Sequence, residues 1–200
     1  MKKLLALALA VFVWQHFYYV SSAPKLGPGV VAGGAPYVSQ ADTKTFRDGD
    51  FTIYPSNNFS AEVRVLHATH YYFDRASRLS PFAMIVGWQE MSDESYIEAY
   101  DFSHFERSYS WDSETMPLES EDVEHKIANL NIIPANNGVK AMLNNIKIGN
   151  VVEIEGFIVN VKSSTGWRWS SAHNDKLSAE PGNQIIYATK ISIVKAISRL

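Results

Sequence analysis

The chain has 200 residues, with 18 basic and 21 acidic side chains and a formal net charge of −3. It contains no cysteine, which excludes disulfides, thiolate metal ligands and cysteine nucleophiles. The sequence has no run of lysine or arginine. Because nucleic-acid binding needs a basic surface, we expect no nucleic-acid partner.

The first 23 residues are typical of an export segment. Lys2 and Lys3 precede the apolar residues 4–14, and small residues follow before residue 24. Residues 4–20 are also long enough for a retained anchor, which needs about 17–25 residues. The sequence therefore predicts either a cleaved signal peptide or a transmembrane helix over residues 1–23. Both place the rest of the chain on the periplasmic side of a bacterial inner membrane.

The stretch that follows, residues 24–45, is rich in proline and glycine. Such a composition breaks helices and central strands, so it predicts a flexible linker. Residues 46–200 are then expected to form a single exported globular domain. That length is sufficient for a core without covalent cross-links.

The first part of this domain shows mixed signals. Ser80 as an N-cap and Pro81 as the first helical residue predict a helix over residues 82–88. Residues 96–105 fit either a strand or a short helix. The remaining expected elements are strands at 51–53, 60–73 and 107–111, and helices at 120–129 and 139–146, the latter capped by Asn136 or Asn137.

The last fifty residues carry the clearest pattern. Alternating apolar residues predict a strand over 151–161 that bends at Gly156, and a closing strand follows at 185–194. Residues 147–156 resemble the entry strands of OB-like domains. We therefore predict an α+β fold, mainly β, with a small OB/SH3-like barrel at the C-terminal end and a few short helices packed on it.

Several segments together resemble a family of uncharacterised bacterial membrane-linked proteins. They are Leu79-Ser80-Pro81, Gly87-Trp88, Met91-Ser92-Asp93, Ile132-Ile133-Pro134-Ala135 and Gly166-Trp167-Arg168-Trp169-Ser170-Ser171. The resemblance spans most of the expected exported domain. It implies an origin in the bacterial envelope and assigns no site.

Histidine and aspartate residues are the only candidates for metal ligands that the sequence suggests. His67, His70 and Asp74 lie close in sequence, but strand residues three apart point to opposite faces. Asp101 and His104 would join them only through tertiary contacts. We therefore predict no metal and no cofactor.

Serine chemistry has equally weak support. The S-x-x-K spacing at residues 192–195 falls on a predicted strand, where the serine and lysine side chains diverge. Ser170, Ser171, His173 and Asp175 provide the side-chain types of a triad, but within one short loop. Because triads are assembled in space from separate elements, we predict no catalytic residue.

Trp167, Arg168 and Trp169 form the most distinctive short segment. On a strand both indoles face one way and the guanidinium faces the other. One interpretation is a ligand-binding platform of Trp167 and Trp169, with Arg168 pairing an anion. The alternative is that both indoles fill the core while Arg168 meets a nearby glutamate.

The sequence as a whole predicts a non-enzymatic binding or assembly module of the bacterial cell envelope, exposed to the periplasm. The expected partner is an envelope protein or a glycan, and the N-terminal segment provides the contact with the membrane. One alternative is an envelope hydrolase acting on peptidoglycan or peptide, with His67, His70, His104 and His173 as the acid–base candidates. Another is a purely structural subunit of an envelope assembly.

Overall fold

A computed structural model of the chain describes residues 26–172 and 183–194. The expected signal peptide or anchor, residues 1–23, lies outside the described residues. Within the described part of the chain, no helix has the length and apolar character needed to span a membrane.

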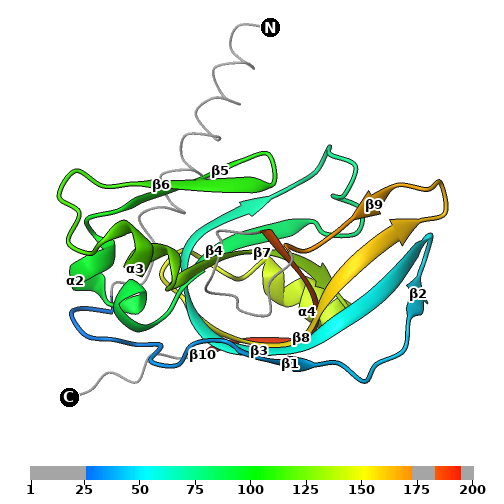
Figure 1. The fold of residues 1–200 in the computed structure, drawn as a ribbon, viewed down its shortest axis with the longest axis horizontal. Helices are drawn as coiled ribbons and strands as arrows, with labels where there is room; N and C mark the ends of the chain where they lie inside the picture. The colour runs from blue at the N-terminus through cyan, green and yellow to red at the C-terminus, as the bar shows by residue number, and fades with distance from the viewer. Residues whose placement is uncertain (1–25, 173–182, 195–200) are drawn as a thin grey trace, which may run out of the picture.

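Strands dominate the described chain, and the helices are short (Figure 1). The prediction of a mainly β member of the α+β class is therefore confirmed. The strands are β1 (Tyr37–Gln40), β2 (Phe46–Asp48), β3 (Phe51–His70), β4 (Phe82–Gly87), β5 (Asp101–Phe105), β6 (Ser108–Asp112), β7 (Ile127–Pro134), β8 (Val151–Ser163), β9 (Arg168–Trp169) and β10 (Asn183–Val194). The helices are the 3-10 helix η1 (Gln89–Ser92) and the α-helices α2 (Glu94–Ile97), α3 (Ser120–Glu124) and α4 (Asn137–Leu143).

The strand pairings of the main sheet run in a circuit. β3 pairs with β4, β4 with β7, β7 with β10, β10 with β8, and β8 returns to β3. The β7–β10 pairing is parallel and the other four are antiparallel. Because the circuit begins at Phe51, it is not confined to the last fifty residues, and the C-terminal location expected for a barrel is not confirmed.

Apolar side chains fill the inside of this circuit. Phe82, Met84 and Val86 of β4 alternate with residues that face outward, and all three are buried in the largest core cluster. Leu130 and Ile132 of β7 belong to the same cluster. Burial of apolar surface of this kind stabilises a fold by roughly 25 cal/mol per Å².

Residues 82–88, predicted as a helix, form strand β4 instead. All six residues of β4 are buried, because its inner face lies in the core and its outer face is covered by further chain. A short apolar run that is buried on both faces has no period that distinguishes helix from strand. The predicted helix over residues 120–129 is also shorter, since α3 ends at Glu124 and β7 begins at Ile127.

Part of the expected flexible linker makes specific contacts with the domain. β1 pairs with residues 57–60 of β3. Before β1, the backbone N–H groups of Val31 and Ala32 donate to Oγ of Ser92, and the N–H of Gly29 donates to Asp93. Ala32 is fully buried. These hydrogen bonds hold residues 29–32 against η1 and the start of α2.

The C-terminal strands agree with the sequence pattern. β8 and β10 cover the two predicted strands, and their register shifts between Ala188 and Lys190, opposite Gly156. A Cβ atom at Gly156 would overlap the carbonyl oxygen of Tyr187. The glycine therefore allows the close approach of two strands at this bend. The predicted cap of α4 is also present, since Asn136 accepts a hydrogen bond from the N–H of Val139.

Candidate functional site

Polar residues lie on the outward face of β3, β7 and β10, where an apolar surface would be expected. Cross-strand pairing places His67 beside Ile85, Ile85 beside Asn129, and Asn129 beside Asn183. Asn131, two residues after Asn129 on β7, pairs with Ala83 of β4. Asn129 and Asn131 are fully buried, between one apolar cluster around Ile127 and another around Ile133.

The β5–β6 hairpin covers these polar residues. In Figure 1 it runs along one side of the molecule above β4 and β7. His104 in β5 and Arg107 in the turn after it both reach down to β7, where they contact Asn129 and Asn131 respectively. We call the set His67, Asp74, Ser80, His104, Arg107, Asn129, Asn131 and Asn183 the polar cluster.

Two histidines of the polar cluster form a chain of hydrogen bonds. Nδ1 of His67 lies 2.8 Å from Nδ1 of His104, and Nε2 of His104 lies 3.0 Å from Oδ1 of Asn129. The amide nitrogen of Asn129 donates to the carbonyl of Arg107 and to Oδ1 of Asn183. The Asn129 oxygen must therefore accept the proton of His104 Nε2. In neutral His104, Nδ1 then accepts, and His67 donates to it.

Burial keeps both imidazoles neutral. Desolvation lowers the pKa of His67, and it lowers the pKa of His104 to about 4. The neighbouring His67 and the positive charge of Arg107 act in the same direction on His104, while the hydrogen bond to Asn129 opposes them. This pair is consequently uncharged at neutral pH, and the donor and acceptor of each of its hydrogen bonds are fixed.

Arg107 is the centre of the second half of the polar cluster. Its guanidinium makes a bidentate pair with Asp74, at 2.5 Å from Nε and 2.8 Å from Nη2. Nη2 also donates to the carbonyl of Ser80, and Nη1 donates to Oγ of Ser80 and to Oδ1 of Asn131. Every N–H group of the guanidinium therefore has a partner within the protein. The hydrogen bonding of Arg107 to the Asp74 carboxylate holds the pKa of Asp74 below its usual range.

Aromatic rings lie on Arg107. Its guanidinium carbon is 3.9 Å from the centroid of the Tyr71 ring and 5.2 Å from that of Trp169. The Tyr71 hydroxyl in turn donates to the carbonyl of Glu106. Arg107 thus fastens together the hairpin turn, the loop that follows β3, and β9. It is a structural clamp rather than a free receptor for an anion.

The predicted Trp167, Arg168 and Trp169 segment lies at the edge of this arrangement. The indole rings of Trp167 and Trp169 are 6.0 Å apart, half-buried, and packed against the apolar cluster around Ile133. Arg168 is exposed between them. The predicted alternation of the two indoles and the guanidinium thus matches this burial pattern. Their role in binding a ligand stays a prediction.

The other histidine and serine candidates are dispersed. His70 packs against Phe82 and Tyr72, away from His67. Oγ of Ser171 donates to the carbonyl of Val159 and accepts from the N–H of Ile185, which is a structural role. The candidates His173, Asp175 and Lys195 lie outside the described residues.

The hydrogen bonds of the two histidines hold their protons within the protein and do not direct them at a reacting group. Each histidine nitrogen whose partner is known faces another imidazole or an amide, not a hydroxyl or a carboxylate. Among the described residues, no group of three or more histidine and acidic side chains is placed to hold a metal ion. The geometry gives the polar cluster no activated nucleophile.

Sequence reasoning missed Arg107, Asn129 and Asn131. Arg107 gave no local signal, because its partners lie 24 to 33 residues away. The two asparagines did give one: they alternate inside an otherwise apolar run, residues 127–133. Buried asparagines on one strand face require partners, which points to a covering polar element.

Comparison of the chain with protein-family models, with curated proteins and with solved structures finds no significant match in any of the three.

Proposed function

We propose that the chain is a non-enzymatic binding module of the bacterial cell envelope, exposed to the periplasm, and that its scaffold is an OB-type barrel. Residues 1–23 would deliver it across the inner membrane or anchor it there. The proposed ligands are an envelope glycan or an envelope protein, and we favour the glycan because OB folds are known oligosaccharide binders.

The order of the strand pairings is the observation that carries this proposal. OB folds are five-stranded Greek-key barrels, and their ligands bind on the second and third strands and on the loops after the first and fourth. In the circuit of this chain the second and third strands are β4 and β7. The loop after the first strand is residues 71–81, and the segment after the fourth includes β9.

The elements that bind ligands in OB folds therefore correspond to those gathered around Arg107. Trp167 and Trp169 supply aromatic surface there, and the clamp of Arg107 on Asp74 holds the adjoining loop in place. A preformed surface loses less conformational entropy when a ligand binds. This supports binding rather than catalysis as the role of the site.

Co-sedimentation with purified peptidoglycan sacculi tests the proposal. We expect the full-length chain, held in detergent micelles, to sediment with sacculi and to release no soluble fragments. The double variant W167A/W169A should lose most of this binding. Tyr37→Ala is the matched control, because Tyr37 is an exposed aromatic residue in β1, which pairs with β3 and not with β8 or β9.

Two results would contradict the proposal. Release of soluble sugar or peptide would favour the envelope hydrolase, for which His67 and His104 are two acid–base candidates that lie together in the described part of the chain. Equal sedimentation of the W167A/W169A variant and the unaltered chain would exclude the tryptophan surface as the binding site.

A further inference from the structure

A pocket of about 310 Å³ opens between the loop after β3 and the C-terminal half of α4. Tyr72 and Arg78 line it from the loop, and Lys140 and Asn144 line it from the helix and its end. Pockets of roughly this size hold small organic ligands. No member of the polar cluster and neither of the two tryptophans lines the pocket, although its lining residue Tyr71 also stacks on Arg107.

The charged side chains that line this pocket are cationic. Its lining contains Arg78 and Lys140 and no aspartate or glutamate. Arg78 has one ion pair within the described chain, to Asp50 at 3.8 Å with both side chains largely exposed, and such pairs are weak. Lys140 has no ion pair with any described residue. Two cations in a concavity attract an anion, although the chain as a whole is acidic.

The lining of the pocket includes aromatic rings. The rings of His70 and Tyr72 are nearly parallel, with an interplanar angle of 24° and centroids 6.2 Å apart. Phe82 meets His70 edge-on at 4.8 Å. The Tyr72 side chain is 73% exposed, so its ring is available to a ligand. An aromatic surface beside cations suits a ligand with a ring and an acidic group.

We infer that this pocket binds an acidic saccharide, with the sugar ring against Tyr72 and the carboxylate between Arg78 and Lys140. The inference rests on the proposed function and adds to it the chemical class of the ligand. Binding in this pocket would give an envelope glycan a second point of attachment and would favour its acidic sugars.

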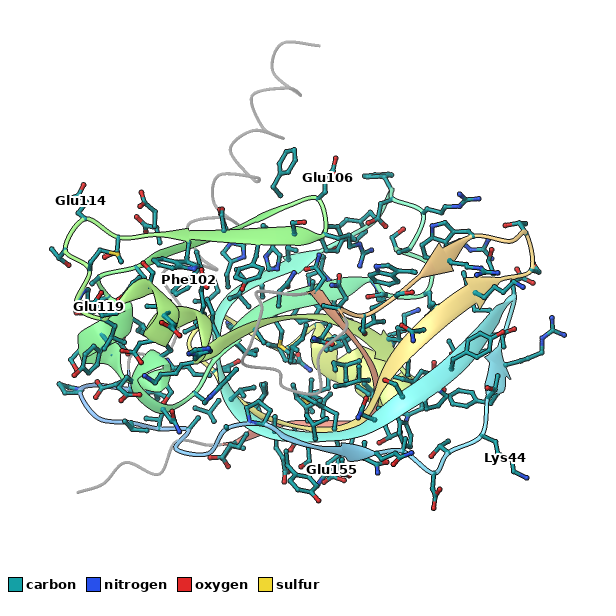
Figure 2. All side chains as sticks on the ribbon, in the orientation of Figure 1. Lys44, Phe102, Glu106, Glu114, Glu119 and Glu155 are labelled. Carbon is teal, nitrogen blue, oxygen red and sulfur yellow. The ribbon has the colours of Figure 1, made fainter. Side chains whose placement is uncertain are left out.

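Titration calorimetry with the full-length chain in micelles tests this inference. The probe is N-acetylmuramic acid, which carries a carboxylate on the sugar, and the neutral comparison is N-acetylglucosamine. We expect the first to bind and the second to bind at least tenfold more weakly. Lys140→Glu and Arg78→Glu should each weaken binding of the acidic probe at least tenfold. Lys44→Glu, a charge reversal at an exposed lysine outside the pocket (labelled in Figure 2), should leave it unchanged.

Other outcomes overturn the inference. Equal binding of the two sugars would remove the role of charge, and equal binding by the K140E and K44E variants would exclude this pocket. Binding to phosphatidylglycerol vesicles without binding of the acidic probe would identify a lipid headgroup instead. If sacculi still bind but the acidic probe does not, this inference fails while the proposed function stands. If the probe binds but sacculi do not, the proposed function fails.

Discussion

Nδ1 of His67 lies 2.8 Å from Nδ1 of His104, across a hydrogen bond that only one of the two nitrogens can donate. The pair therefore tolerates the neutral state and has no place for a proton on both Nδ1 atoms. Burial supports the same state by lowering the pKa of each histidine. The pair ties β3 to the β5–β6 hairpin, so its protonation bears on the stability of the fold.

The free energy of unfolding should fall as the pH drops from about 6.5 to about 4. In this window the unfolded chain binds protons at these histidines, with an ordinary pKa of about 6.5, while folded His104 does not until about 4. Urea unfolding of the full-length chain at pH 7.5 and pH 5.0 measures this loss. His104→Gln should weaken the dependence and leave the part due to His67 and His70, whose pKa values burial also lowers. The exposed His125→Gln should keep it unchanged. An unchanged slope in His104→Gln would contradict the account.

Arg107→Ala should lower the free energy of unfolding by about 2–3 kcal/mol, because it leaves Asp74, Asn131 and Ser80 without their shared charged partner. Arg107→Lys should recover little, since an ammonium cannot form the bidentate fork. Chemical denaturation measures both variants. Arg47→Ala, at an exposed arginine, should change stability by less than about 0.5 kcal/mol. Full stability in Arg107→Ala would show that the clamp is dispensable.

Gly156→Ala should be among the most disruptive single methyl additions, with a cost of about 3 kcal/mol or more. The new Cβ would overlap backbone atoms of Tyr187, which cannot move aside as the end of a side chain can. Thermal melts followed by circular dichroism test this. Gly34→Ala is the control, because its Cβ would meet open space. Similar melting temperatures for the two variants would argue against the close approach of β8 and β10.

Ser92→Ala should release the segment before β1. The change leaves the N–H groups of Val31 and Ala32 without their acceptor, at a cost of about 2 kcal/mol. Hydrogen exchange at residues 29–34 should accelerate, while exchange in β8 stays slow. Ser164→Ala, at an exposed serine, should leave both unchanged. If residues 29–34 already exchange at the rate of unstructured chain, the segment is a linker after all.

The sequence predicted the elements whose patterns are local. β8 and β10 followed from alternating residues and a glycine. The cap of α4 was predicted at Asn136 or Asn137, and the structure places it at Asn136. β4 was missed because Ser80 and Pro81 imitate a helix start, whereas pairing with β3 and β7 decides the conformation. A strand buried on both faces has no polar face to reveal its period.

The polar cluster could not be predicted from the sequence, for a different reason. His67 and His104 are 37 residues apart in sequence, and they meet only because the hairpin crosses the outer face of β3 and β7. Arg107 likewise takes its partners from the loop after β3 and from β7. The alternation of Trp167, Arg168 and Trp169 followed from local sequence, whereas the binding role of the two tryptophans stays a prediction. Long-range registers of this kind follow from the assembled sheet, not from local preference.

Hydrogen–deuterium exchange in the presence of a soluble glycan shows whether a ligand binds around Arg107. The full-length chain in micelles would be compared with and without peptidoglycan fragments obtained by muramidase digestion of sacculi. We expect the bound glycan to slow exchange in residues 71–81, 104–108 and 167–171, around Arg107. Protection confined to β1 and β2 would contradict binding around Arg107. The absence of protection at fragment concentrations that saturate sacculus binding would contradict it as well.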